Sequence, residues 1–356
     1  MKATLILENG DIFEGQSIGA TDDRICELVF NTSMTGYQEL LTDPTCAGQG
    51  IVMSYPLIGN YGVNEEDMES GRPWASAFIV RSLSHRGSNF RCRGSLDDYL
   101  KNNSITGIQG VDTRALTKIL RNQGTMKGMI TCAENFSIPD ALEAIRAWKA
   151  ENGVEAVTRK EQKTLPAEGE QVCRVAVLDL GARNTMVDCL RQRGCKVTLL
   201  PAATSAEAIL AGGYDGVVLS EGPGDPAENK AVVAQIKKLY ESDLPLFACG
   251  LGHQLLALAT GGATEKLPYG HRGANHPVRE IATGKLAITG QNHGYAVAAG
   301  PAEAAVSYAN VNDGTVEGLE YQRPNCFSVQ FTVDRGTGKI FDRFVDMMKG
   351  GAQSCR

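Results

Sequence analysis

The stretch Pro245-Leu246-Phe247-Ala248-Cys249-Gly250-Leu251-Gly252-His253-Gln254 decides how the second half of this chain folds. Its apolar first half predicts a buried strand over 244–248, and apolar leucines spaced over 253–260 predict a helix that ends at Gly261. A sharp turn between a buried strand and a helix can expose a nucleophile above a sheet. The pattern G-x-C-x-G would place that thiol at position 250, which is glycine, and the nearest thiol is Cys249.

The same alternation of strand and helix extends on either side of this turn. Expected strands cover 172–178, 196–200, 216–219 and 244–248, and expected helices cover 185–193, 205–211, 231–240 and 253–260. Alternating elements of this length predict an α/β fold, a doubly wound and mostly parallel sheet. Functional residues are then expected in the loops after the strands, here 220–226 and the turn at Gly250.

The first 150 residues follow a different pattern, in which short strands mix with two helices. A strand and a turn at Asn9-Gly10 begin the chain, and Ser95 and Asp112 are the expected caps of the two helices. We expect a mixed α+β domain over 1–150, a polar linker over 151–171 and the α/β domain over 172–350.

Composition limits the class of protein. The chain has 356 residues, 42% hydrophobic and 21% charged, and a net charge of -6, which disfavours a nucleic-acid or anionic-membrane partner. Its start lacks the apolar core of a signal peptide, and no apolar run is long enough to span a membrane. The ten cysteines are scattered, without zinc-site spacing, so we expect reduced thiols and a cytoplasmic location.

Several longer blocks are characteristic of one family. They are 30–39 (FNTSMTGYQE), 42–44 (TDP), 55–62 (YPLIGNYG), 110–114 (GVDTR), 220–226 (SEGPGDP), 251–254 (LGHQ), 269–278 (YGHRGANHPV) and 291–297 (QNHGYAV). Over nearly its whole length the chain resembles the small, glutamine-amidotransferase subunit of carbamoyl-phosphate synthetase. The blocks before residue 150 are characteristic of that subunit rather than of amidotransferases in general.

The resemblance implies a small-subunit N-terminal domain followed by a class I amidotransferase domain of flavodoxin-like fold. That domain hydrolyses glutamine through a Cys, His, Glu triad and passes ammonia through a tunnel to a large subunit. The large subunit is the implied partner in a heterodimer, and it uses ATP, bicarbonate and Mg to make carbamoyl phosphate for arginine or pyrimidine synthesis. The resemblance implies no cofactor and no metal on this chain.

The family's glutamine contacts can be carried over by position. They fall on Thr45, Gly222, Gly224, Leu251, Gln254, Asn292, Gly294 and Tyr295. Thr45 stands where the family usually has serine and keeps the hydroxyl. The resemblance therefore implies that L-glutamine remains a possible ligand.

The triad positions have changed. The family's nucleophile falls on Gly250, its base on Thr332 and its orienting carboxylate on Asp334, and no histidine follows His293. A thiolate and a base are both needed to form the thioester, and threonine does not titrate near neutrality. Glycine tolerates the positive φ expected at such a turn, so Gly250 would preserve the turn while deleting the reaction.

Two interpretations stay open for each of the other reactive residues. Cys249 is a substitute nucleophile or, as strand alternation favours, a buried structural thiol. Asp334 is a remnant of the triad or, more simply, a solvated loop acid. Glu221, where the family has asparagine, places a negative charge beside the pocket or faces solvent.

The histidines pose a similar choice. His253, His271, His276 and His293 could suggest a metal site, but they are assigned to two loops and a helix without a matching acidic set. Structural hydrogen bonding is therefore the favoured role.

Three functions follow. The preferred one is a small subunit with impaired or lost glutaminase activity that supports synthesis from ammonia as a scaffold or regulator. The second is a non-catalytic module that senses glutamine. The third is an active glutaminase that uses Cys249.

Overall fold

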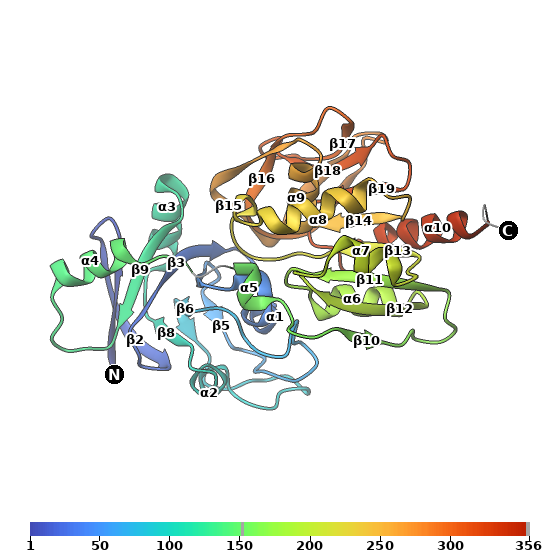
Figure 1. Ribbon diagram of the computed structural model, residues 1–356. Helices are drawn as coiled ribbons and strands as arrows, with labels where there is room; N and C mark the ends of the chain where they lie inside the picture. Colours follow the sequence, from blue (N-terminus) through green and yellow to red (C-terminus); the bar gives the residue numbers. More distant parts are fainter. Residues whose placement is uncertain (151–152, 354–356) are drawn as a thin grey trace. The chain divides into compact units, whose positions relative to one another are not determined.

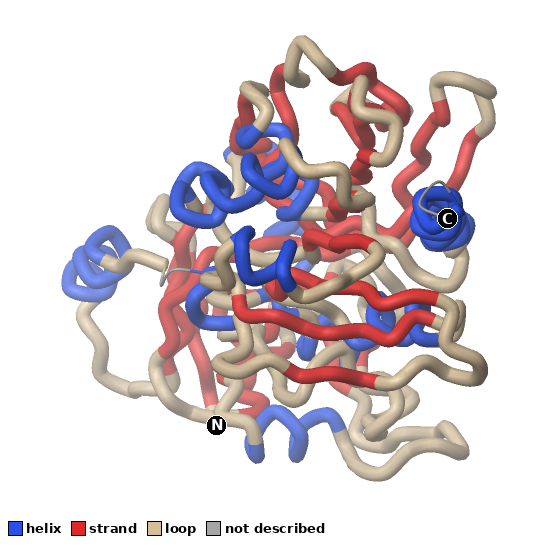
Figure 2. Tube along the Cα trace, turned by 45° about the vertical axis from the view of Figure 1, so that its right-hand side comes forward, coloured by secondary structure: helices blue, strands red, loops and turns tan. Residues whose placement is uncertain are grey.

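The computed structural model describes residues 1–150 and 153–353. The chain divides into two compact units, Met1–Glu151 and Asn152–Arg356, each with its own core. Figure 1 labels the elements of both units, and Figure 2 colours helices blue and strands red. The second unit has the α/β architecture predicted from the sequence.

The first unit is built on a closed β-barrel with strand order β1-β2-β8-β6-β4-β3-β9. The hairpin expected at the start is present, because β1 pairs antiparallel with β2 around Gly10, which has φ 92°. The strands of this unit are β1 (Lys2–Leu7), β2 (Ile12–Gly19), β3 (Arg24–Asn31), β4 (Gln49–Met53), β5 (Leu57–Ile58), β6 (Ala77–Val80), β7 (Ser82–Leu83), β8 (Thr106–Gln109) and β9 (Met126–Thr131).

The helices of the first unit begin where their capping residues predict. The Ser95 hydroxyl accepts from the Asp98 amide at the start of α2 (Leu96–Asn102), and the Asp112 carboxylate accepts from the Ala115 amide at α3 (Thr113–Gln123). Two more helices, α1 (Tyr37–Thr42) and α4 (Ile138–Ala147), were not expected. Helix α4 packs Ala141 and Ile145 against Ile6 of the barrel.

The second unit contains a ten-stranded sheet with order β10-β12-β11-β13-β14-β19-β18-β16-β15-β17. Strands β12, β11, β13, β14 and β19 run parallel to one another. The strands are β10 (Lys163–Leu165), β11 (Cys173–Asp179), β12 (Cys195–Pro201), β13 (Gly216–Leu219), β14 (Leu246–Cys249), β15 (Ala263–Glu280), β16 (Leu286–Ala299), β17 (Ala304–Asn310), β18 (Val316–Tyr321) and β19 (Cys326–Val329).

Helices cover both faces of the parallel strands. The helices are α5 (Gly153–Val157), α6 (Asn184–Arg191), α7 (Ala206–Ala211), α8 (Lys230–Tyr240), α9 (Leu251–Ala259) and α10 (Lys339–Gln353). Buried residues of α7, α8 and α9 share one core cluster, and those of α6 and α10 share the other. From β11 to α9, each strand that precedes a helix ends, and each of those helices begins, within two residues of the predicted position.

Two expectations for this unit need correction. The polar segment 151–171 was expected to be a linker, yet its described part contains α5 and β10, and β10 pairs antiparallel with β12. Val154 and Val157 are buried, which a polar composition concealed. Strands β15, β16, β17 and β18 are antiparallel, so the parallel order ends at β19. Residues 151 and 152 lie outside the described residues.

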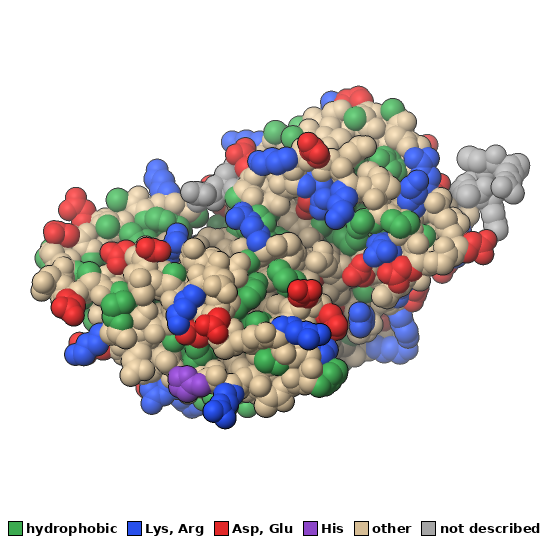
Figure 3. All heavy atoms as spheres, turned by 90° about the horizontal axis from the view of Figure 1, so that it is seen from below, with side chains coloured by type: hydrophobic (Ala, Val, Ile, Leu, Met, Phe, Trp, Pro, Cys, Tyr) green, Lys and Arg blue, Asp and Glu red, His purple; other side chains and the backbone are tan. Residues whose placement is uncertain are grey.

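The surface agrees with the modest negative charge. On the face drawn in Figure 3, acidic and basic side chains are interspersed rather than collected into one basic stripe. Among the described helices, none has the length and apolar character needed to cross a bilayer.

A matched pair of substitutions tests the core beneath α9. Leu255 is fully buried and Leu286 is 61% exposed, both in the second unit. We expect Leu255→Ala to lower the free energy of unfolding by about 2–5 kcal/mol, because it leaves a cavity, and Leu286→Ala to change it by less than about 0.5 kcal/mol. Urea denaturation followed by circular dichroism measures both, and equal losses would contradict this packing.

Candidate functional site

The turn between β14 and α9 has the strained backbone of a nucleophile elbow. Gly250 has φ 55° and ψ -119°, a conformation that L side chains rarely adopt. Its amide donates to the Val329 carbonyl at 3.1 Å, which ties the turn to β19. Glycine therefore adopts this geometry without the steric cost that another residue would incur.

The space above Gly250 is occupied by Glu221, which follows β13. A Cβ built on Gly250 would lie 2.9 Å from Glu221 Cγ, 3.1 Å from its Cβ and 3.2 Å from its Cα. Such distances are shorter than ordinary van der Waals contact, so a side chain at position 250 requires Glu221 to move. Glu221 is 4% exposed, so the interpretation that it faces solvent is wrong.

Cys249 points away from this turn into the packing beneath the sheet. Its thiol is fully buried, with Sγ 3.8 Å from Met186 Sδ and 3.7 Å from the Leu219 carbonyl oxygen. Burial raises the pKa of the Cys249 thiol well above its usual value, and the charge of Glu221 raises it further. The position matches strand alternation, and the thiolate needed for nucleophilic attack is strongly disfavoured there.

The other two triad positions lie just after β19, the parallel neighbour of β14. The Thr332 amide donates to the Gly290 carbonyl at 3.0 Å, which fixes its backbone beside β16. Asp334 Oδ1 accepts from the amides of Gly336 and Thr337 at 2.8 and 3.0 Å. Asp334 thus stabilises a local turn and is partly buried, rather than a fully solvated acid.

The predicted glutamine contacts of the second unit come from three elements. Gly222 and Gly224 lie in the loop after β13, Leu251 and Gln254 on α9, and Asn292, Gly294 and Tyr295 on β16. A side chain at Gly222 would meet the Leu180 carbonyl oxygen and Leu251 Cδ2, so glycine allows this close approach.

One direct hydrogen bond connects two of these elements. Gln254 Nε2 donates to the Tyr295 carbonyl at 2.7 Å and to Gln330 Oε1 at 2.9 Å. Gln330 was not among the predicted site residues, although it lies two residues before Thr332. Thr45 belongs to the first unit, where its amide and hydroxyl both donate to Asp43 Oδ1, and its role toward glutamine stays a prediction.

The histidines are arranged differently from the sequence interpretation. His253 is fully buried on α9, with Nδ1 2.7 Å from Ser328 Oγ. His271 and His276 lie on β15 and His293 on β16, so the assignment of these residues to loops is wrong. Glycine and polar residues interrupt the alternation that would have indicated strands, and the register of the two strands shifts on either side of the pairing of His271 with His293.

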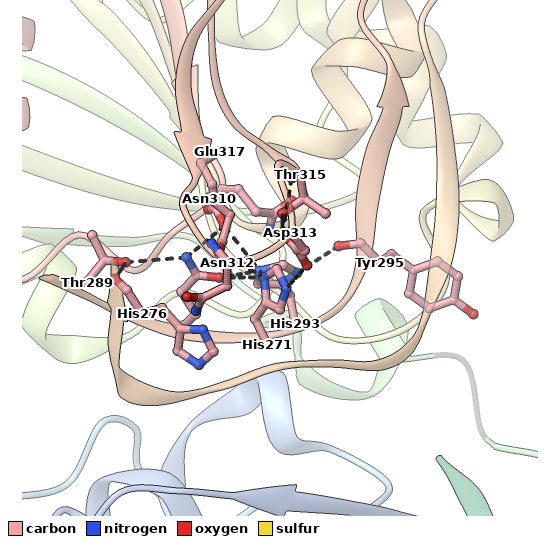
Figure 4. A network of polar contacts seen from close by, with 12 residues as sticks. His271, His276, Thr289, His293, Tyr295, Asn310, Asn312, Asp313, Thr315 and Glu317 are labelled. Atoms are coloured by element: carbon pink, nitrogen blue, oxygen red, sulfur yellow. Dashed lines mark hydrogen bonds and ion pairs between the residues drawn. The ribbon is translucent and has the colours of Figure 1, made fainter. Parts of the chain in front are cut away.

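A buried polar network surrounds two of these histidines (Figure 4). His271 Nε2 is 2.8 Å from Asp313 Oδ2, and its Nδ1 is 3.0 Å from Gln291 Oε1. His293 Nδ1 is 2.8 Å from the Tyr295 carbonyl oxygen, and its Nε2 is 2.8 Å from Gln291 Oε1. Sequence reasoning missed Gln291, Asp313 and Glu317 because the acids lie more than 35 residues beyond His271.

Glu317 closes the network from β18. Its Oε1 accepts from Gln291 Nε2 and from Asn310 Nδ2, each at 2.8 Å, and its side chain is fully buried. Burial lowers the pKa of His271, but hydrogen bonds to Glu317 and Asp313 outweigh that effect and leave it raised. These contacts are consistent with the favoured role of the histidines in structural hydrogen bonding. The imidazole nitrogens and the Glu317 carboxylate are also atoms that can bind a cation.

Comparison with known families agrees with this two-unit architecture. Residues 5–130 match the family "Carbamoyl-phosphate synthase small chain, CPSase domain", and residues 176–332 match "Glutamine amidotransferase class-I". The carbamoyl phosphate synthase small chain of Clostridium perfringens is 45% identical over 350 residues, which cover 97% of this chain and 99% of that one. The chain belongs to the carbamoyl-phosphate synthase small-chain family.

Other members of the family show the same extent of similarity. The small chain of Symbiobacterium thermophilum is 44% identical over 98% of this chain and 99% of its own length. The pyrimidine-specific small chain of Bacillus subtilis is 41% identical over 98% of this chain and 96% of its own. The resemblance stated from the sequence is confirmed, and the second unit contains the family's class I amidotransferase domain.

Chemical labelling of this small chain tests the buried position of Cys249. Native protein treated with iodoacetamide at pH 8 and mapped by mass spectrometry should be labelled at the partly exposed Cys92 and Cys132, and not at Cys249. In urea all of them should react. Labelling of native protein at Cys249 by iodoacetamide or by a glutamine-analogue affinity label would contradict an inert thiol.

His253 predicts a pH dependence of stability. Burial lowers its pKa to about 3, whereas in the unfolded chain it titrates near its usual value of 6.5. Between these values the unfolded state binds the extra proton, so this contribution to stability falls as pH decreases below about 6.5, by at most about 1.4 kcal/mol per pH unit.

Comparison with His253→Gln isolates this effect, because the other titrating groups are shared. Urea denaturation at pH 7, 6 and 5 should show a steeper loss for the native sequence than for the variant. Parallel pH curves for the two proteins would show that His253 does not titrate in this way.

Proposed function

We propose that this chain is a carbamoyl-phosphate synthase small subunit whose glutaminase chemistry has been lost. It assembles with a large subunit that takes free ammonia as its nitrogen source, and acts there as a scaffold or regulator. The observation that carries the proposal is the pair formed by Gly250 and Glu221. Gly250 offers no nucleophile at the elbow, and the buried Glu221 occupies the space that a nucleophilic side chain needs.

The chemistry of thioester formation supports the same conclusion. The reaction needs a thiolate, a base that activates it and an acid that protonates departing ammonia. Thr332 provides neither of the proton-transfer functions, and Asp334 is engaged by its own turn. Backbone N–H donors at the elbow would stabilise the tetrahedral intermediate of the reaction, but no side chain at position 250 can attack glutamine to form that intermediate.

Cys249 does not offer a second route. To reach a substrate above the elbow, its thiol would have to leave the contacts with Met186 and Leu219 and lose a proton in an apolar core. Burying a charge there is costly. An active glutaminase that uses Cys249 is therefore the outcome that these contacts oppose.

A second candidate function is glutamine sensing without hydrolysis. Its support is the hydrogen bond from Gln254 to the Tyr295 carbonyl, which joins two predicted glutamine-binding elements. Polar groups placed in this way can orient a ligand whether or not a nucleophile is present. A sensor would bind glutamine saturably and release no ammonia, whereas a pure scaffold would bind none.

Reconstitution with a carbamoyl-phosphate synthase large subunit tests the proposal. The complex should make carbamoyl phosphate from ammonium chloride with ATP, Mg²⁺ and bicarbonate, and its rate with glutamine should be at least about 100-fold lower, since removal of triad groups typically costs that much or more. The ammonium arm is the internal control for an assembled, competent complex.

Each result separates the candidates. Equal rates with glutamine and ammonium chloride would overturn the loss of glutaminase chemistry. Titration calorimetry with L-glutamine, with Gln254→Ala as the control, then distinguishes scaffold from sensor, because heat that disappears in the variant indicates the predicted pocket.

A further inference from the structure

The network around Gln291 brings acceptor atoms together in a way that hydrogen bonds between uncharged imidazole and amide groups do not satisfy. Gln291 Oε1 lies 3.0 Å from His271 Nδ1 and 2.8 Å from His293 Nε2, and its Nε2 lies 2.8 Å from Glu317 Oε1. An uncharged imidazole has one N–H, and His293 directs its Nδ1 at the Tyr295 carbonyl, which only accepts. His293 Nε2 then presents a lone pair to Gln291 Oε1.

Turning the Gln291 amide over moves the conflict without removing it. The NH₂ group would then donate to both histidines, but Oε1 would face Glu317 Oε1 at the same 2.8 Å separation. The neighbouring Thr289 hydroxyl offers no hydrogen, because it already donates to the His276 carbonyl. In either orientation the network lacks positive charge, which protons or a metal ion can supply.

The outer contacts of these residues are those of metal ligands. A histidine that binds a metal through one nitrogen usually donates the other N–H to a carboxylate or backbone carbonyl. His271 Nε2 faces the Asp313 carboxylate, and His293 Nδ1 faces the Tyr295 carbonyl, which leaves His271 Nδ1 and His293 Nε2 directed inward. Figure 4 shows the Tyr295 ring pointing away from this centre while its carbonyl faces His293.

The third ligand is buried and positioned by its own hydrogen bonds. Glu317 is fully buried, its Oε1 accepts from Gln291 and Asn310, and its Oε2 has no hydrogen-bond partner. A buried carboxylate oxygen without a partner is costly, and a cation removes that cost. Among the described residues, this is the one group of three or more histidine, cysteine or acidic side chains with its ligand atoms within 4.8 Å of one another.

We propose that His271 Nδ1, His293 Nε2, the Glu317 carboxylate and Gln291 Oε1 bind a divalent first-row transition-metal ion. Ligands about 2.1 Å from such an ion lie roughly 3.0–3.4 Å apart, and imidazole and carboxylate are ordinary zinc ligands. Three of the ligand-to-ligand distances here are 2.8 Å (His293 Nε2 to Gln291 Oε1), 3.0 Å (His271 Nδ1 to Gln291 Oε1) and 3.5 Å (His271 Nδ1 to Glu317 Oε1). Only small side-chain shifts are needed for this geometry.

The ion would hold three antiparallel strands together. His271 lies on β15, His293 and Gln291 on β16, and Glu317 on β18, so one centre crosslinks the β15–β16 hairpin to β18. Binding to the folded state alone raises its stability in proportion to the logarithm of free metal concentration. The role is structural and does not depend on whether the chain hydrolyses glutamine.

Metal content of the full chain is the direct test. Protein produced in zinc-supplemented medium, freed of any affinity tag and analysed by mass spectrometry of metals, should contain about one zinc ion per chain. His293→Gln and Glu317→Gln should each reduce that content at least about tenfold. His276→Gln is the matched control and should retain the metal. The ring centroids of His276 and His271 are 5.3 Å apart, and His276 contributes no ligand.

Measurements on the unaltered sequence keep the proposal testable if the variants do not fold. Removal of metal with a chelator should lower the melting temperature, addition of ZnCl₂ should restore it, and CoCl₂ should give the visible absorption of Co²⁺ bound to nitrogen and oxygen ligands. Folded protein that contains no zinc and binds neither ion by calorimetry would overturn the proposal. Full zinc content in His293→Gln would overturn it as well.

Discussion

The reversal of the chain at Gly250 is the constraint on which the site depends. The chain leaves a fully buried strand and enters a helix at a single residue with φ 55° and ψ -119°. Because β13, β14 and β19 are parallel neighbours, the loop that bears Glu221, the elbow and the segment that contains Thr332 all emerge at the same ends of their strands. The backbone dihedrals of Gly250 set the direction of α9, and this direction places Gln254 within hydrogen-bond distance of the Tyr295 carbonyl.

The antiparallel half of the sheet is stabilised in a different way. The parallel strands are buried on both faces by apolar clusters, whereas β15, β16 and β18 enclose a polar network centred on Gln291. Polar groups in a low-dielectric interior need complete sets of partners, so this region tolerates less variation in charge than the apolar core does. Strand β16, which carries Gln291, also carries Asn292, Gly294 and Tyr295. The rigidity of the network and that of the predicted glutamine site are therefore linked.

Much of the α/β unit could be predicted from the sequence because its strands are continuous apolar runs between amphipathic helices. The elements from β11 to α9 follow that rule, and the capping residues Ser95 and Asp112 located two helices of the first unit. The described part of 151–171 was misinterpreted because two buried valines are enough to anchor a short helix within a polar stretch. Strands β15 and β16 were missed because glycines and histidines interrupt their alternation, and the burial of Glu221 depends on a neighbour 29 positions away that has no side chain.

The fit between Gly250 and Glu221 makes it hard to place a side chain at the elbow by one substitution. A cysteine placed at position 250 would reintroduce roughly 1–3 kcal/mol of backbone strain, and it would also collide with Glu221. Replacing Glu221 first would open a void beside a glycine, with no catalytic gain to compensate for the lost packing. Each single step towards a nucleophile is therefore opposed by the other residue. The two positions constrain each other, so placing a thiol at position 250 would require coordinated changes rather than one substitution.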